Sequence, residues 1–206
     1  MHVDGMGGRL PLLAPASLHG DARRLYDRLV EGRLRSNSPF TSRADTGELI
    51  GPFNAMLHAP AVAGGFIDFH EAEERATPLS ARVREVVILS VGAVWDSAFE
   101  TYAHRAVAAQ AGFTSQAAAA LAGGEPCDGL TVDEQAAQSF TLELARDRVV
   151  SDATYAEAER AFGREGLVAL VFLAAAYSAT CVMLNAFAVP APNVDRSSTF
   201  HAVRGE

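Results

Sequence analysis

The sequence predicts an all-α protein, a compact bundle of about seven or eight helices, and three observations support this fold class. Apolar residues recur at three- and four-residue spacings along most of the chain, which is the pattern of helices with one buried face. Residues suited to cap a helix, chiefly Ser, Thr and Asp, precede several of these segments. Runs of β-branched residues alternating with polar ones between turn signals are lacking, so the sequence predicts no strand.

The first half of the chain is expected to contain an arm, a helix, a loop and two further helical segments. Residues 1–17 are rich in Gly, Leu and Pro and are expected to lie as an extended arm over the body. Residues 18–34 have the spacing of an amphipathic helix. Residues 36–53 break that periodicity with Ser, Gly and Pro, and are predicted to form a loop of the length that often closes over a pocket. A short segment ending at Pro60 and residues 61–75 resume the helical pattern.

Capping residues mark the helices of the second half. Ser80 fits the N-cap of a helix over residues 81–94, and Asp96 or Ser97 fits that of a following helix, which Gly112 ends. The remaining helices are predicted over residues 114–121, 131–146, 152–162 and 167–189.

The uncharged segment 167–189 is long enough to span a bilayer. It is rich in Ala and carries the polar residues Tyr177, Ser178, Thr180 and Asn185, so it is less apolar than a Leu-rich span. No basic cluster anchors either end. We therefore expect a helix buried on all sides, within the fold or between subunits, and no membrane partner.

The charge balance excludes several classes of function. The 206 residues include 17 basic and 25 acidic side chains, for a net charge of −8, so a surface for nucleic acid is not expected. Every basic residue is Arg and none is Lys, which excludes chemistry that needs an amine nucleophile, including pyridoxal-lysine chemistry.

The two cysteines indicate neither a redox pair nor a thiolate metal cluster. Cys127 and Cys181 lie far apart in the chain and form no CxxC motif. The N-terminus lacks the basic start and long apolar run of a signal peptide. We therefore expect a cytoplasmic protein.

Three polar side chains, two of which could perform acid–base chemistry, share one helix face. Ser97, Glu100 and His104 lie at positions i, i+3 and i+7 of the helix that begins near Asp96, so they form one stripe. Glu85 lies on the preceding helix, and the short connection could bring its carboxylate to the same place. A His held between two carboxylates in a helical core, with one Glu shifted toward neutral pH by desolvation, could hold and transfer protons.

A structural alternative stays open at this point. Glu85 could pair with Arg82 or Arg84, and Glu100 and His104 could form an ordinary surface pair at i and i+4.

The motif around these residues resembles a known family. It comprises Arg84-Glu85, the run WDSAFETYAH that ends at His104, and AQAGFT, which follows closely. Together they resemble the core motif of the carboxymuconolactone decarboxylase and AhpD-like family. In the alkylhydroperoxidase branch this motif contains a Glu, a Cys-x-x-Cys pair and a His, and the thiols reduce peroxide while Glu and His relay the proton. Here Glu85 and His104 match the relay, whereas Ser97 and Glu100 occupy the two Cys positions.

The resemblance implies a fold, an assembly and a limit on the activity. It implies an AhpD-like helical bundle that assembles as a homo-oligomer, a trimer or hexamer, with the site near an interface. Residues 51–189 would form the core of a single domain covering residues 1–206, with a C-terminal tail from 190, and 167–189 would be a core or interface helix. Thiol peroxidase activity is not expected, because neither a hydroxyl nor a carboxylate can replace a redox thiol.

Four residues are candidates for binding a substrate. Ser97 could donate a hydrogen bond. His58 lies within the segment NAMLHAP, which resembles a pocket-forming helix of the family, and Phe53 directly precedes it. Trp95 could line the same pocket. A structural role is the alternative for His58, at a helix end, and for Trp95, at a helix start.

We expect neither a metal nor another cofactor. His70 stands in a run of glutamates, but contiguous acidic residues point around a helix and usually form a solvated face. Arg82 and Arg84 are candidates to hold a substrate carboxylate.

These observations predict a cofactor-independent, non-redox enzyme that uses Glu85, Glu100 and His104 for proton transfer on a small organic acid or lactone. Decarboxylation, or a related lyase or isomerase step, fits best because such reactions form a carbanion or enolate. One alternative is an inert ligand-binding or structural oligomer of the same fold. A second is residual redox activity through Cys127 or Cys181.

Overall fold

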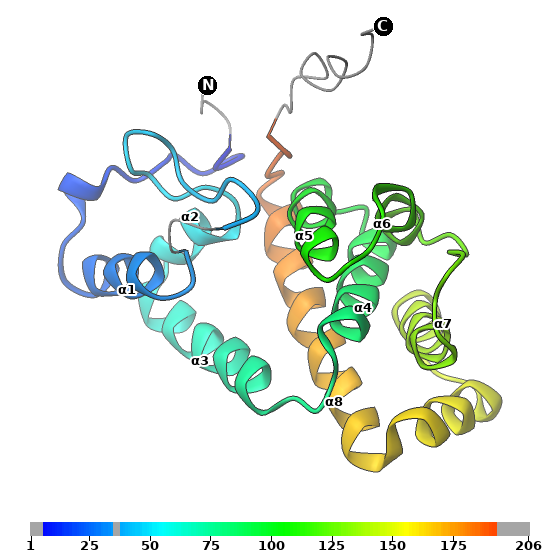
Figure 1. Ribbon diagram of the computed structural model, residues 1–206. Helices are drawn as coiled ribbons and strands as arrows, with labels where there is room; N and C mark the ends of the chain where they lie inside the picture. Colours follow the sequence, from blue (N-terminus) through cyan, green and yellow to red (C-terminus); the bar gives the residue numbers. More distant parts are fainter. Residues whose placement is uncertain (1–5, 35–37, 193–206) are drawn as a thin grey trace, which may run out of the picture.

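The predicted all-α fold is confirmed. A computed structural model describes residues 6–34 and 38–192. Within these ranges it contains eight α-helices, a short 3₁₀ helix at Pro15–Ser17 and no named strand (Figure 1). Arg43 and Leu49 form an isolated antiparallel bridge in the predicted loop. Parts of the predicted arm and tail, residues 1–5 and 193–206, lie outside the described residues.

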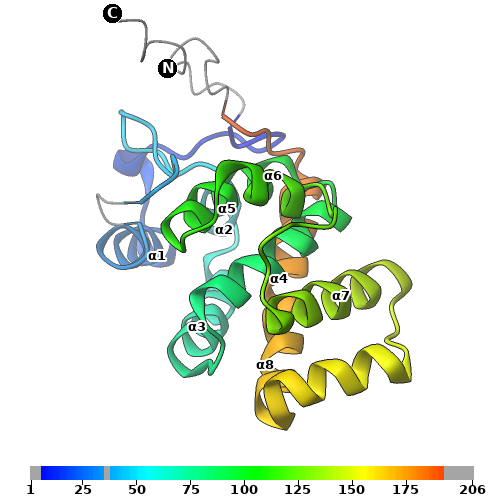
Figure 2. The same ribbon diagram turned by 45° about the vertical axis from the view of Figure 1, so that its right-hand side comes forward.

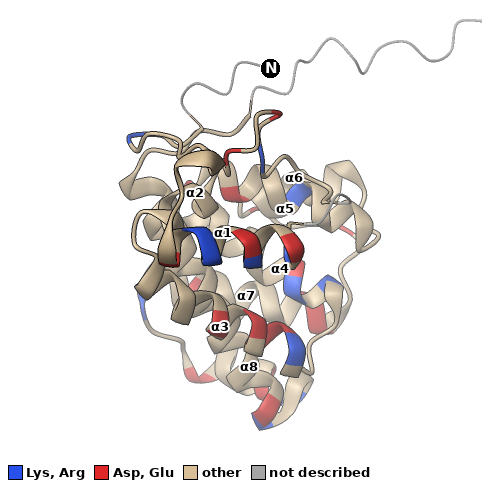
Figure 3. Cartoon of the chain, turned by 90° about the vertical axis from the view of Figure 1, so that its left-hand side faces the viewer, with Lys and Arg blue, Asp and Glu red and all other residues tan. Residues whose placement is uncertain are grey.

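Three N-terminal helices pack together: α1 (Gly20–Glu31), α2 (Pro52–Leu57) and α3 (Pro60–Ala76). Ion pairs link the α1 region to the acidic face of α3 at the surface (Figure 3). Their apolar faces share one cluster, which excludes water from the contact and contains Leu25, Tyr26, Leu29, Leu49, Phe53, Leu57 and Ile67.

The other five helices form a bundle around α4 (Ala81–Val94). This helix contacts α5 (Ala98–Gln110), α6 (Ser115–Ala122), α7 (Val132–Asp147) and α8 (Asp152–Ala186). It is apolar on almost every face, and its middle is buried throughout, as expected for the central helix of a bundle.

Local signals set the ends of these helices. The Ser80 hydroxyl accepts a hydrogen bond from the backbone of α4. Thr131 and Glu134 form the complete capping box that their spacing predicts. Ser97 occupies the N-cap position of α5 without a side-chain bond, and Gly112, with φ of 91°, follows the end of that helix.

Helix α8 contains a sharp break. Gly163 has φ of 63° and ψ of −179°, and the helix turns there between its yellow and orange parts (Figures 1 and 2). The break separates the two helices predicted over 152–162 and 167–189. Among the described residues, α8 is long and apolar enough to cross a membrane by length and composition, but half of its most apolar stretch is buried in the protein. Core helices of soluble proteins show the same property.

The N-terminal arm ties the two groups of helices together. The backbone N–H of Arg9 donates to the carbonyl of Phe187, after α8. Asn54 of α2 donates to Pro11 and accepts from the backbone of Leu13. Helices α2 and α3 also contact α8. The N-terminal helices and the bundle are therefore held together both by the arm and by direct helix contacts.

Candidate active site

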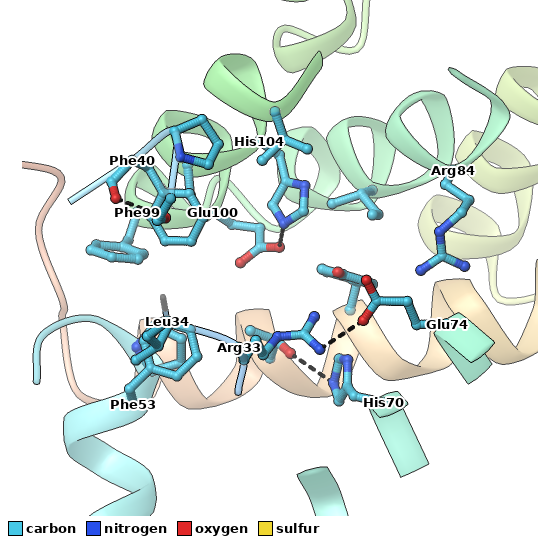
Figure 4. Close-up of a pocket in the computed structure, with 18 of the residues that line it drawn as sticks. Arg33, Leu34, Phe40, Phe53, His70, Glu74, Arg84, Phe99, Glu100 and His104 are labelled. Atoms are coloured by element: carbon cyan, nitrogen blue, oxygen red, sulfur yellow. Dashed lines mark hydrogen bonds and ion pairs between the residues drawn. The ribbon is translucent and has the colours of Figure 1, made fainter. Parts of the chain in front are cut away.

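A cavity of about 400 Å³ lies between the N-terminal helices and the bundle. Aromatic and aliphatic side chains gather on one side of it, and charged side chains face one another beside them (Figure 4). The apolar lining includes Leu34, Phe40, Phe53, Met56 and Phe99, and the polar lining includes Arg33, His70, Glu74, Arg84, Glu85, Glu100, His104, Tyr177 and Thr180. A mostly apolar concave site with a few polar groups is typical of small-molecule binding.

Glu85, Glu100 and His104 come together in this cavity. His104 Nδ1 lies 2.9 Å from Glu85 Oε2, within hydrogen-bond distance. Its Nε2 lies 3.4 Å from Glu100 Oε1, an ion-pair contact. All three side chains are largely buried. This Glu100 oxygen is buried, and apart from the contact with His104 it has no hydrogen-bond partner among the described residues.

Burial and charge determine the protonation of this group. Burial raises the pKa of Glu100, and the nearby Glu85 raises it further, although His104 opposes both. Burial alone would lower the pKa of His104, but the charges of Glu85 and Glu100 outweigh it and the pKa is raised. Both Glu100 and His104 therefore hold a proton more tightly than the same groups do in water.

A second imidazole lies deeper in the cavity wall. His70 is buried, its Nε2 lies 3.5 Å from Thr180 Oγ1, and Phe66 packs edge-on against its ring. Burial lowers the pKa of His70 to about 4, and the positive charges of Arg33 and Arg84 act in the same direction. His70 is consequently neutral at physiological pH, whereas the pKa of His104 is shifted in the opposite direction.

The structural alternative for Glu85 is wrong, because both neighbouring arginines have other partners. Arg82 binds both carboxylate oxygens of Glu134, at 2.6 and 3.0 Å. Arg84 lines the cavity but pairs with the buried Glu73. Arg82 therefore does not reach a ligand in this cavity.

Only one of the four predicted binding residues lines the cavity. Phe53 lines the cavity, but Ser97, His58 and Trp95 do not. Ser97 is buried at the start of α5 with its hydroxyl unpartnered. His58 falls just beyond α2, is exposed, and lies 3.1 Å from the Pro11 carbonyl. Trp95 is 38% exposed. The expectation that these three contact a ligand in the cavity is therefore corrected.

Several lining residues were missed by the sequence analysis. His70 could have been found, because Ala63, Ile67 and His70 lie at helical spacing and form the buried face of α3. The glutamates next to His70 in the sequence instead favour a solvent-exposed helix face. Arg33 and Glu74 carry no comparable signal, since their places depend on how distant segments pack. Tyr177 and Thr180 lie in a largely apolar segment, and sequence alone does not show which of its polar residues face the cavity.

The described part of the chain contains no group of three or more His, Cys, Asp or Glu side chains arranged to hold a metal ion.

Comparisons with known proteins identify the fold. No protein-family model and no curated protein matches the sequence. An AhpD-core, peroxidase-related protein from Ralstonia eutropha JMP134 superposes with a TM-score of 0.72 at 18% identity, covering 90% of this chain and 93% of the other. A protein from Agrobacterium tumefaciens, a possible antioxidant defence protein of AhpD type, gives 0.62 at 14% identity over 68% and 96%.

A third solved structure is a single-substitution variant of the debrominase Bmp8 in complex with 2,3,4-tribromopyrrole. It has a TM-score of 0.68 at 14% identity and covers 88% of this chain and 92% of the other. This chain therefore has the AhpD-like fold that its motif suggested.

Proposed function

We propose that this protein is an acid–base enzyme that transfers protons to or from carbon in a small organic acid or lactone. The observation that supports this most is the buried group of Glu85, His104 and Glu100, whose side chains contact one another in the wall of the cavity. General acids and bases work best when their pKa values are shifted toward the working pH, and those of Glu100 and His104 are both raised.

The residues of the site that can donate or accept a proton suit a decarboxylation or an isomerisation. Loss of CO₂ breaks a carbon–carbon bond and leaves its electron pair on carbon, where an adjacent carbonyl delocalises it as an enolate. Glu100 or His104 then donates the proton that replaces the carboxyl group. In an isomerisation, the deprotonated form of Glu100 takes a proton from one carbon and returns it to another. Glu85 orients His104 in both cases.

Activity on a small molecule is consistent with one structural neighbour. The debrominase Bmp8 has been crystallised with 2,3,4-tribromopyrrole, so this fold can hold a small ring compound. We do not extend debromination or peroxide reduction to this chain. The motif has Ser97 and Glu100 where the family's redox cysteines would stand, and Cys181 is fully buried.

Hydrogen–deuterium exchange at carbon tests the proposal even though the reaction product is unidentified. Small carboxylic acids and lactones are incubated with the protein in D₂O, and NMR follows deuterium uptake and CO₂ release. We expect Glu100→Gln and His104→Gln each to lower the rate by about 100-fold or more. Matched controls are Glu157→Gln and His19→Gln, both at exposed positions outside the cavity, and these should react like the wild type.

The rate should also follow a bell-shaped pH profile whose limbs belong to the coupled pair. A flat profile across neutral pH contradicts acid–base catalysis by Glu100 and His104. A folded protein that binds these compounds without exchange or turnover supports the alternative of an inert binding module.

A further inference from the structure

Arg33 is a cation at the cavity that the sequence analysis missed. It lies in the turn just after α1, and its side chain, 26% exposed, faces Glu100 and His104 across the cavity (Figure 4). Its Nη1 donates a 3.1 Å hydrogen bond to Glu74 Oε2.

The charge of Arg33 affects the pKa values of three ionisable residues that line the cavity. Burial is the largest single influence on the pKa values of His70, Glu100 and His104, and the positive charge of Arg33 is a further one that lowers each of them. An anion beside Arg33 would therefore lie close to the proposed acid–base residues.

The partner of Arg33 is easily exchanged. Glu74 is 60% exposed, and an exposed ion pair contributes little net stability because water solvates the released carboxylate. The other arginine at the cavity differs, since Arg84 and its partner Glu73 are 13% and 5% exposed. Separating that pair would strand a buried charge, which is costly. Arg33 is accordingly the cation suited to accept a ligand carboxylate.

The end of the cavity beside these charged groups is apolar and aromatic (Figure 4). Phe40 packs edge-on against Phe99, with ring centroids 6.5 Å apart, and Phe53 lies near them (Figure 4). This surface offers no charge to a ligand but would bury a ring or a branched alkyl group. A guanidinium with aromatic rings beside it matches a molecule with an anionic end and an apolar body.

We propose, building on the function proposed above, that Arg33 binds the carboxylate of the substrate in exchange for Glu74. The substrate is then an amphipathic carboxylic acid whose apolar body lies against Phe40, Phe53 and Phe99. Its carbon next to the carboxylate faces Glu100 and His104, where a proton can be removed or added.

This placement restricts the reaction. Carbon dioxide is neutral, so an arginine that holds a carboxylate stabilises the starting state more than the transition state for losing that group. The bond to the carboxyl group held by Arg33 therefore stays intact. A monoacid at this site exchanges or moves a proton on the neighbouring carbon, and only a substrate with a second carboxyl group near Glu100 loses CO₂.

Binding of a matched pair of probes tests the proposal. The probes are 3-phenylpropanoate and its neutral analogue 3-phenylpropanamide, and ligand-observed NMR titration measures their affinities at neutral pH. We expect the wild type to bind the acid about tenfold more tightly than the amide. Arg33→Gln should remove that preference and leave amide binding unchanged. Glu74→Gln should strengthen acid binding severalfold, because it removes the competing carboxylate.

A matched control is Arg28→Gln. Arg28 pairs with Asp68 and Glu71 at the surface and does not line the cavity, so this variant should keep the wild-type preference. Equal binding of the two probes by the wild type, or an acid preference that survives Arg33→Gln, overturns the proposal. So does a failure of both probes to bind at millimolar concentration. The Glu74→Gln variant provides an independent test if Arg33→Gln does not fold.

These outcomes are separable from those of the proposed function. Should Arg33 control acid binding while no exchange at carbon occurs, the carboxylate site stands and the enzymatic proposal fails. Should turnover depend on Glu100 and His104 while Arg33→Gln binds acids normally, the enzyme stands and the assignment of Arg33 fails.

Discussion

The ring of Tyr177 packs edge-on against the imidazole of His104, with the ring centroids 5.1 Å apart. Tyr177 makes a similar contact with His70, at 5.3 Å. One residue of α8 thus supports two imidazoles whose pKa values are shifted in opposite directions, and the Glu85 carboxylate fixes His104 from α4. Because His104 is held from two sides, its orientation depends on the packing of the bundle.

The first prediction concerns the pair of Glu85 and His104. Glu85→Gln keeps a hydrogen-bonding side chain but removes the charge that most strongly opposes the effect of burial on His104. The pKa of His104 should therefore fall in this variant. An NMR titration of the six His residues measures this, with His104→Gln used to assign the signal. Glu71→Gln, outside the cavity lining, should leave the titration unchanged.

An unchanged His104 titration in Glu85→Gln would contradict the assigned ion pair.

The second prediction is a loss of stability in acid caused by His70. Its pKa is about 4 in the native protein against 6.5 ordinarily. The unfolded chain therefore takes up a proton on His70 as the pH falls through 6.5, whereas the native protein does not until about pH 4. The native state should lose about 3 kcal/mol across this window. Urea unfolding of the wild type and His70→Phe at several pH values measures the effect.

The difference in unfolding free energy between the wild type and His70→Phe, followed against pH, reports the contribution of His70 separately from that of the other ionisable groups. The raised pKa values of His104 and Glu100 act in the opposite sense, because the native state binds those protons more tightly and gains stability as the pH falls. Both proteins retain these groups. Parallel stability curves for wild type and His70→Phe between pH 6.5 and 4 would show that His70 titrates normally.

The sequence predicted those parts of the site that depend on local geometry. Glu100 and His104 share a helix face by spacing alone, and Glu85 lies on the preceding helix, so few packings could keep them apart. The caps at Ser80 and Thr131 are likewise local. For the same reason the sequence predicted most of the helices.

The errors arise where tertiary packing decides. Arg33 meets Glu74 across 41 positions of sequence, and no short-range pattern anticipates such a contact. His58 lies only five positions after Phe53 in the chain, yet it stands one residue past the buried helix α2 and is exposed. Trp95 likewise lies at the end of a helix, the C-cap position of α4, and is partly exposed. Proximity in sequence does not decide which side of a helix end faces a cavity.

A third prediction concerns the two thiols. Burial raises the pKa of Cys181, which is fully buried, and burial also raises the pKa of the partly exposed Cys127. Both thiols should be poor nucleophiles. In the native protein, an aromatic disulfide reagent should label Cys127 slowly and Cys181 only after denaturation. Rapid native labelling of Cys181, or peroxide consumption that alkylation abolishes, would restore the redox alternative.

A fourth prediction is self-association through α8. Val168, Val171 and Phe172 expose 53%, 42% and 52% of their surface, and contiguous exposed apolar residues often mark an interface. We expect light scattering to show more than one subunit in solution. Phe172→Glu should lower the measured mass, whereas Val132→Glu, at an exposed position on α7, should not. A monomeric wild type would contradict the homo-oligomer that we expect.

The last prediction tests how tightly the aromatic side of the cavity is built. Gly51 precedes α2 with φ of 67°, and a Cβ there would lie 2.3 Å from the Phe99 ring. Gly51→Ala should therefore destabilise the protein by about 2 to 4 kcal/mol, through backbone strain and overpacking together. Gly129→Ala is the matched control, because Gly129 also has positive φ but nothing lies within 4 Å of its Cβ position. It should lose about 1 kcal/mol, from strain alone. Thermal and urea unfolding measure both variants, and equal losses would mean that Phe99 moves aside freely and does not form a fixed wall of the cavity.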